Sequence, residues 1–392
     1  MMHSSKKGLI LPILILTIIP LIASWFAYAE HLPPGFGVFP PLQVLEPATP
    51  GFNLWVFVVL LAIELVLTFF LLFPQKFGFK PVEAPLPYAR KPLPWWFWLG
   101  GAMTLVFWYL MWARPAPLME LVYVAFTPLW WGFITLLDGL VYARSGGYSL
   151  MSKKPKLFGI TIVVSLFAWY YFEYFDYFAL GNWYYPNSVL IPELSHTTIV
   201  VLYLLAYTTV WPAVFEWYTL LHTFPKLAVK YADGPKIKLP GTALLVIGLG
   251  LMTLMVFYPY PLFWALWIGI MLVFAGVLVR MDIPSPISEL AKGNWSPMIL
   301  IALSALFNGL FWEMWNYGSA HPVEPIANPN YWVYDVPYVN VIHLFSEMPL
   351  LGYFGYLAFG LIVWLMFIWA GKLFGFNTYL LKEDERKYNS EV

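Results

Sequence analysis

Two pairs of polar residues, each with a glutamate, have the residue types and the spacing that acid–base chemistry requires. Glu173 and Asp176 stand three residues apart in one apolar run, and Glu313 and Asn316 stand three apart in another. Side chains at this spacing share one face of an α-helix. A carboxyl group within an apolar span is costly, so it faces the interior of the bundle and marks a functional position. We predict that Glu173 and Glu313 are acid or base groups and that Asp176 and Asn316 orient them.

An aromatic segment follows each pair, which makes the pattern an internal repeat. In the same order, each copy has an asparagine, a tryptophan, a tyrosine, a proline and a histidine: Asn182, Trp183, Tyr185, Pro186 and His196, then Asn330, Trp332, Tyr334, Pro337 and His343. Sites in duplicated membrane proteins often lie between the repeats. We therefore expect the tryptophans, tyrosines and histidines of these segments to bind the substrate. The alternative is that the repeat only reflects how two helix pairs pack.

Glu347 is a third candidate for acid or base chemistry. It stands in the string Phe345-Ser-Glu347-Met-Pro349, directly before the last apolar run. We expect it in the first turn of that helix, where the positive end of the helix dipole favours a carboxylate. The alternative role is therefore that of a helix cap.

Acids outnumber cations inside the apolar runs. Eight acids lie within or at the edges of the runs: Glu64, Glu120, Asp138, Glu173, Asp176, Glu216, Glu313 and Glu347. Arg114 is the one basic residue expected on the outward side. Most of these acids must therefore bond to Asn, Tyr, Trp or water, and a neutral carboxyl in an aromatic pocket is a proton donor.

Several other chemistries are excluded or weak. The chain has no cysteine and no Gly-x-Ser-x-Gly or phosphate-loop motif. Its six histidines lack His-x-x-x-His spacing. A metal held by His196, His343 and Glu347, or a haem held by His196 and His222, are the alternatives; we expect neither a metal nor a cofactor. What remains is acid chemistry among aromatic rings, which suits carbocations formed from a lipid-soluble polyene or isoprenoid.

The segment from Asp176 to Pro186, DYFALGNWYYP, resembles the Trp-Asp…Gly-x-Trp-x-Tyr-x-Pro segment of the membrane lycopene cyclase (carotenoid cyclase) family. The segment around Trp332 is similar. In that family a Pro-x-Glu-Glu motif on the next helix carries the catalytic acids, and here Glu347 takes the place of one of them. The resemblance implies a cyclase- or hydratase-like enzyme that acts on carotenoids or other isoprenoids.

Composition predicts the elements that must position these residues. The chain has 392 residues, 61% of them hydrophobic and 11% charged. Such a composition excludes a soluble globular enzyme, a nucleic-acid binder and a disordered protein. We predict an all-α polytopic membrane bundle. The ten apolar runs that are long enough to cross a bilayer are 8–28, 53–73, 95–113, 118–142, 157–179, 197–224, 240–258, 260–280, 297–316 and 342–373.

Basic residues set the predicted orientation. Of the 21 lysines and arginines, all but Arg114 fall in alternate loops that share one side with the N-terminus. The positive-inside rule then places both termini in the cytoplasm, and we expect a prokaryotic-type plasma membrane. Ala27-Tyr28-Ala29 also resembles a signal-peptide cleavage site, but the run before it is long, and we favour an uncleaved anchor.

We divide the single membrane domain into N-terminal helices (1–150), a first repeat unit (151–240) and a second (241–392). Three other functions stay open. They are a non-catalytic subunit that packs against partner subunits in the membrane, a proton-coupled transporter with acids at several depths, and a lipid-binding module. If the protein is an enzyme, its expected ligand is a membrane lipid or polyene. We expect no nucleic-acid partner.

Overall fold

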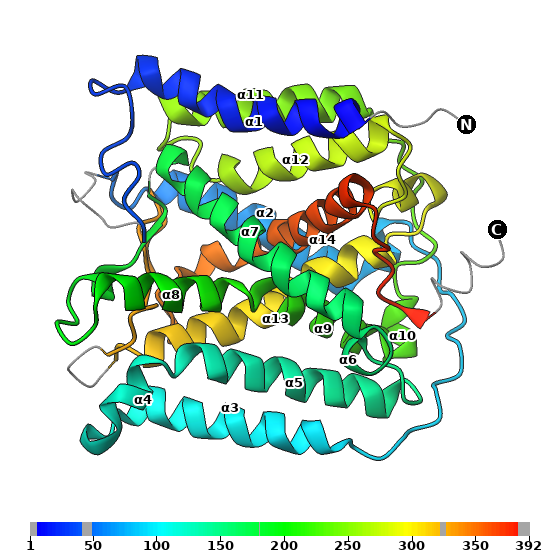
Figure 1. The fold of residues 1–392 in the computed structure, drawn as a ribbon. Helices are drawn as coiled ribbons and strands as arrows, with labels where there is room; N and C mark the ends of the chain where they lie inside the picture. Colours follow the sequence, from blue (N-terminus) through cyan, green and yellow to red (C-terminus); the bar gives the residue numbers. More distant parts are fainter. Residues whose placement is uncertain (1–5, 41–48, 180, 322–326, 383–392) are drawn as a thin grey trace.

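The structure, a computed structural model, describes residues 6–40, 49–179, 181–321 and 327–382, and this part of the chain is mostly helical (Figure 1). Its long helices are α1 (Lys6–Ala27), α2 (Leu54–Leu72), α3 (Trp95–Ala113), α5 (Phe126–Arg144), α7 (Pro155–Ala179), α8 (His196–Tyr207), α9 (Val210–His222), α11 (Gly241–Phe257), α12 (Ala265–Arg280), α13 (Ser296–Gly318) and α14 (Gly355–Phe374). The short helices are α4 (Met119–Tyr123), α6 (Leu150–Lys153) and α10 (Pro225–Ala228), with 3-10 turns at Pro74–Phe77, Ala116–Leu118, Pro186–Ser188, Ser288–Lys292 and Leu350–Phe354. The two strands are β1 (Trp183–Tyr184) and β2 (Val333–Tyr334).

Seven helical segments of the described chain are long and apolar enough to cross a membrane, or up to eight if a bent pair counts as one span. Helices α11 and α12 are apolar but shorter, at 17 and 16 residues. Each of the ten predicted runs contains a helix, so the predicted helical membrane-type fold is confirmed. The number of crossings and the orientation stay predictions.

Two predicted runs differ from the structure. The run 118–142 is broken, because α4 and α5 meet at an angle of 68°. In the run 342–373, helical structure begins only at Leu350. The expectation that Glu347 occupies the first helical turn is therefore wrong. Pro349 accounts for the late start, since a proline disfavours helical backbone in the residue before it.

Small residues let neighbouring helices pack closely. A Cβ atom added at Gly276 of α12 would lie 2.6 Å from the backbone nitrogen of Leu245 in α11. Only glycine allows this approach, which is typical of helix pairs in membranes. Helices α3 and α5 form a second close pair. The centre of the bundle is aromatic, and Trp130, Trp211 and Trp315 are among its largest fully buried side chains.

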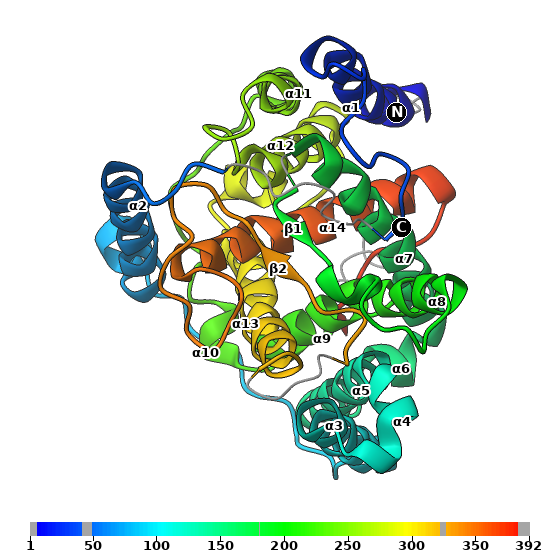
Figure 2. The ribbon, with the colours of Figure 1, turned by 90° about the vertical axis from the view of Figure 1, so that its left-hand side faces the viewer.

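The two sequence repeats meet at β1 and β2. Trp183 pairs with Tyr334 and Tyr184 pairs with Val333 in an antiparallel ladder. Since Trp183 corresponds to Trp332 and Tyr185 to Tyr334, this register relates the two aromatic segments by a local two-fold axis. Figure 2 looks onto the end of the bundle that carries the two strands, and in Figure 1 both described chain ends lie at the opposite end.

Helix α2 stands apart from the other helices at the edge of the bundle (Figure 2). None of its residues is buried, and its closest neighbours are the 3-10 turns at Pro74–Phe77 and Leu350–Phe354. An apolar helix with so little protein around it is suited to contact with lipid.

Candidate functional site

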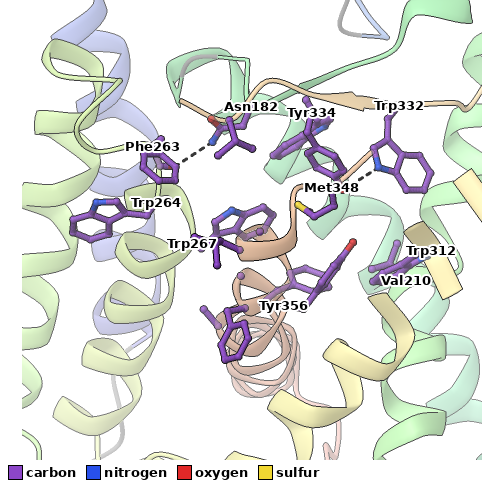
Figure 3. A pocket seen from close by; sticks show the side chains of 18 of the residues that line it. Asn182, Val210, Phe263, Trp264, Trp267, Trp312, Trp332, Tyr334, Met348 and Tyr356 are labelled. Atoms are coloured by element: carbon purple, nitrogen blue, oxygen red, sulfur yellow. Dashed lines mark hydrogen bonds between the residues drawn. The ribbon is translucent and has the colours of Figure 1, made fainter. Parts of the chain in front are cut away.

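A cavity of about 320 Å³ is lined by α2 on one side and by the bundle and the segments of β1 and β2 on the other. Figure 3 shows part of its aromatic wall. Its lining comes from both repeat units and, outside them, from α2 and α5. Aromatic side chains form much of its wall, and six of them are tryptophans: Trp169, Trp183, Trp264, Trp267, Trp312 and Trp332. Five are tyrosines, namely Tyr185, Tyr203, Tyr207, Tyr334 and Tyr356, and four are phenylalanines, namely Phe126, Phe263, Phe354 and Phe359. Aromatic, concave sites with few polar groups are typical of binding sites for nonpolar ligands.

Glu173 lies behind this wall in the first repeat. Its side chain is buried and accepts hydrogen bonds from Trp169 Nε1 at 2.9 Å and from Trp183 Nε1 at 3.2 Å. The Tyr185 hydroxyl donates a further, short hydrogen bond to Oε1. An indole nitrogen can only donate, so these contacts suit a carboxylate. All three donors line the cavity, although the carboxylate itself does not.

Glu313 occupies the equivalent place in the second repeat. It is fully buried, and its Oε1 accepts hydrogen bonds from Tyr334 OH at 2.8 Å and Tyr356 OH at 2.6 Å. Trp332 Nε1 donates to the hydroxyl of Tyr334 at 2.9 Å, so a chain of hydrogen bonds runs from the cavity wall to the carboxylate (Figure 3). Burial, together with the charge of Glu313, raises the pKa of Tyr334 well above its usual value, so this hydroxyl remains protonated.

Asp176 and Asn316 hold the two aromatic segments in place. Asp176 is buried and its Oδ1 accepts from the backbone nitrogen of Asn182 at 2.9 Å. Asn316 is bonded twice to the backbone of Trp332, donating to its carbonyl at 2.7 Å and accepting from its nitrogen at 3.1 Å. The repeated Glu-x-x-Asp/Asn spacing thus has two tasks. The glutamate bonds to the aromatic side chains, and the second residue bonds to the backbone that carries them.

These buried carboxylates have no basic partner within the described part of the chain. The ion pairs recorded there join Lys292 to Glu289 and His321 to Glu347. Hydrogen bonds to the charged form compensate Glu173 and Glu313 for the loss of water. In its charged form, each places negative charge behind an aromatic wall, where it attracts positive charge in the cavity.

Glu64 is the carboxyl residue that lines the cavity itself, and none other does so among the described residues. It lies half-buried near the middle of α2. Sequence reasoning placed it within a span but did not predict its place in the site. A helix that is apolar on every side does not reveal which face meets the protein.

The remaining predicted site residues lie away from the cavity. Glu347 is in a loop, where it accepts hydrogen bonds from Tyr331 OH at 2.7 Å and contacts His321 Nε2 at 2.8 Å. His196, the first residue of α8, and His343 are exposed. The structure therefore brings Trp183, Tyr185, Trp332 and Tyr334 to the cavity and leaves the two histidines and Glu347 outside it.

A separate acidic pair, Asp138 and Glu216, lies away from the cavity, and both side chains are fully buried. Asp138 accepts from Trp96 Nε1 at 3.0 Å, Ser149 Oγ at 2.8 Å and the backbone nitrogen of Met151 at 2.9 Å. These bonds tie α3, α5 and α6 together. We assign this pair to the packing of these helices rather than to the cavity.

Sequence reasoning missed Tyr356 and Trp267, two prominent wall residues (Figure 3). Both stand in long apolar helices without a repeat partner in the recognised motif. Their only signal is their aromatic character, which they share with one residue in five.

Among the described residues, no group of three His, Cys, Asp or Glu side chains is arranged to hold a metal ion. His196 and His222 stand at opposite ends of the α8–α9 segment, so they do not face one haem site.

Comparison of the chain with protein-family models, curated proteins and solved structures finds no match. The resemblance to the carotenoid cyclase family stays a prediction.

Proposed function

We propose that this protein binds a nonpolar isoprenoid or polyene lipid in the aromatic cavity and converts it through a carbocation, as a cyclase or hydratase does. The observation that carries the proposal is the pair of buried carboxylates behind one aromatic wall. Glu173 accepts hydrogen bonds from cavity-lining tryptophan and tyrosine side chains, and Glu313 accepts them from two cavity-lining tyrosines. Such a site stabilises positive charge on a ligand that has no polar groups of its own.

We propose further that the chain crosses the plasma membrane ten times with both termini in the cytoplasm. The helix found in each apolar run and the one-sided distribution of lysine and arginine support this topology. The cavity then lies toward the outer side, next to α2. A lipid-soluble substrate can reach it from the bilayer without passing through water.

The aromatic wall supports two stages of such a reaction, the stabilisation of the cation and the later removal of a proton from it. Tyr185, Tyr334 and Tyr356 donate hydrogen bonds to the glutamates, which leaves oxygen lone pairs as acceptors, one of which on Tyr334 is taken by Trp332 Nε1. The lone pairs and the faces of the tryptophan rings stabilise a cation during ring closure or addition of water. A hydroxyl such as that of Tyr334 then accepts the proton that leaves the substrate, while its own proton moves to Glu313.

The experiment uses the purified chain in liposomes with the acyclic polyene lycopene as the probe. We expect a cyclic or hydrated product, identified by chromatography and mass spectrometry. Loss of conversion in both Glu173→Gln and Glu313→Gln, with normal conversion in Glu347→Gln, would support the assigned roles. Binding of the probe without any product would favour the lipid-binding module, and neither binding nor product would favour the subunit or transporter functions.

A further inference from the structure

One face of α2 belongs to the cavity. Leu60, Ile63, Glu64 and Leu67 line it, and their spacing of three and four residues defines a single helical stripe. Leu65 and Val66 do not line the cavity and are 60% and 58% accessible, while Ile63 and Leu67 of the stripe are 51% and 38% accessible. Glu64 is thus a carboxyl group held between the aromatic wall and the lipid-facing surface of an isolated helix.

The surroundings of Glu64 differ from those of the two buried glutamates. Hydrogen-bond donors surround Glu173 and Glu313 and favour their charged forms. No donor or cation within the described chain contacts Glu64, which stands among leucine and isoleucine. An apolar environment without a partner favours the neutral acid. Burial disfavours the charged form of all three glutamates, and donors offset this effect at Glu173 and Glu313 but not at Glu64. Differences of this kind between carboxyl groups assign the acid and the base in enzymes that use two of them.

We infer that Glu64 is the proton donor of the cavity, and that Glu173 and Glu313 are its charged counterparts on the opposite wall. This inference rests on the proposed function and names the residue that starts the reaction. The site as a whole therefore consists of a neutral acid on α2 facing two carboxylates behind tyrosines and tryptophans.

The proposed step is balanced within the site. The O–H bond of Glu64 breaks and its proton forms a new C–H bond with one carbon of a substrate double bond, using the π electron pair. Ring closure transfers the positive charge to a ring carbon, which loses a C–H proton to form a double bond; in the hydration, water adds to the cation and loses one of its protons. The released proton passes through Tyr334 to Glu313. Glu313 then gives up this proton to water and Glu64 takes one up from water, so no net proton is consumed over a turnover. No oxidant, reductant or metal is required.

The protonation state of Glu64 can be tested without knowing the substrate. Dicyclohexylcarbodiimide is lipid-soluble and reacts with neutral carboxyl groups that it can reach from the bilayer. We expect the full-length protein in liposomes to be labelled at Glu64, located by mass spectrometry of its peptides. Labelling must disappear in Glu64→Gln and persist in Leu65→Gln, a matched variant that places the same amide on the exposed face of α2.

An unlabelled wild-type Glu64, or labelling at Glu173 or Glu313 in its place, would overturn the inference. The second measurement is conversion of lycopene in D₂O. We expect deuterium in the product of the wild type and a loss of rate of about a hundred-fold or more in Glu64→Gln, with probe binding retained. Normal conversion by Glu64→Gln would refute the role of Glu64 alone, whereas a wild type that neither binds nor converts the probe would refute the proposed function.

Discussion

The hydrogen bond between Tyr356 and Glu313 links α14 to α13, and it offers a quantitative test of the site. Tyr356→Phe removes a donor at 2.6 Å while Tyr334 remains at 2.8 Å. A hydrogen bond to a charged group contributes about 1.5–3 kcal/mol, whereas bonds between helices in membranes average about 0.6 kcal/mol. We therefore expect Tyr356→Phe to lower the free energy of unfolding by about 1–2 kcal/mol.

Glu313→Ala has a larger effect, because it leaves the hydroxyls of both Tyr334 and Tyr356 without an acceptor. Each unpaired buried hydroxyl costs about 1–3 kcal/mol. In that background Tyr356→Phe removes an unpaired group and costs almost nothing. The two substitutions should therefore be coupled by about 1–2 kcal/mol, well above the roughly 0.3–0.5 kcal/mol within which independent sites add.

The assay is reversible unfolding of the protein in mixed micelles with increasing dodecyl sulfate, followed by circular dichroism. Thr253→Val is the matched control, since Thr253 Oγ1 donates at 2.8 Å to Leu249 within the same helix. Its effect should add to that of Glu313→Ala. Additive losses for Tyr356→Phe and Glu313→Ala would refute the claim that Tyr356 acts through Glu313.

Three further results are expected. Asp176→Asn should change stability by less than about 1 kcal/mol, because an amide oxygen can still accept from the backbone, as Asn316 does in the second repeat. Asp176→Leu should cost about 1–3 kcal/mol, and equal losses for the two variants in thermal unfolding would contradict this. Gly276→Ala should destabilise the α11–α12 pair by about 1–3 kcal/mol, whereas Gly250→Ala should be tolerated because the added methyl group meets nothing within 4 Å. Similar melting temperatures of the two variants would argue against close packing of α11 on α12. His343→Ala should retain binding of lycopene and Trp267→Ala should lose it, because Trp267 lines the cavity and His343 does not. Binding is measured by quenching of tryptophan fluorescence.

The sequence predicted the helices well because apolar runs of this length have few other structures open to them. It also predicted that Glu173 and Glu313 share a setting with Trp183, Tyr185, Trp332 and Tyr334. The repeated spacing carried this information, since the same order of residues folds into the same local contacts twice.

The misplaced and missed residues have physical causes. Glu347 was expected in a helix because its run is apolar, but helical structure starts only after Pro349. Glu64 and Tyr356 reach the site through the packing of whole helices. The sequence of a uniformly apolar helix does not indicate which of its faces contacts which neighbour. The strand pairing of Trp183 with Tyr334 joins segments 151 residues apart (334 − 183), beyond the reach of any local pattern.

The central claim is that the cavity between α2 and the bundle binds a nonpolar isoprenoid or polyene. The most direct measurement is mass spectrometry of the lipids extracted from the protein after purification in mild detergent. We expect a stoichiometric isoprenoid or polyene in the wild type, lost in Trp267→Ala and retained in His343→Ala. A folded wild type that carries only bulk phospholipid, or an isoprenoid equally retained by both variants, would contradict the claim.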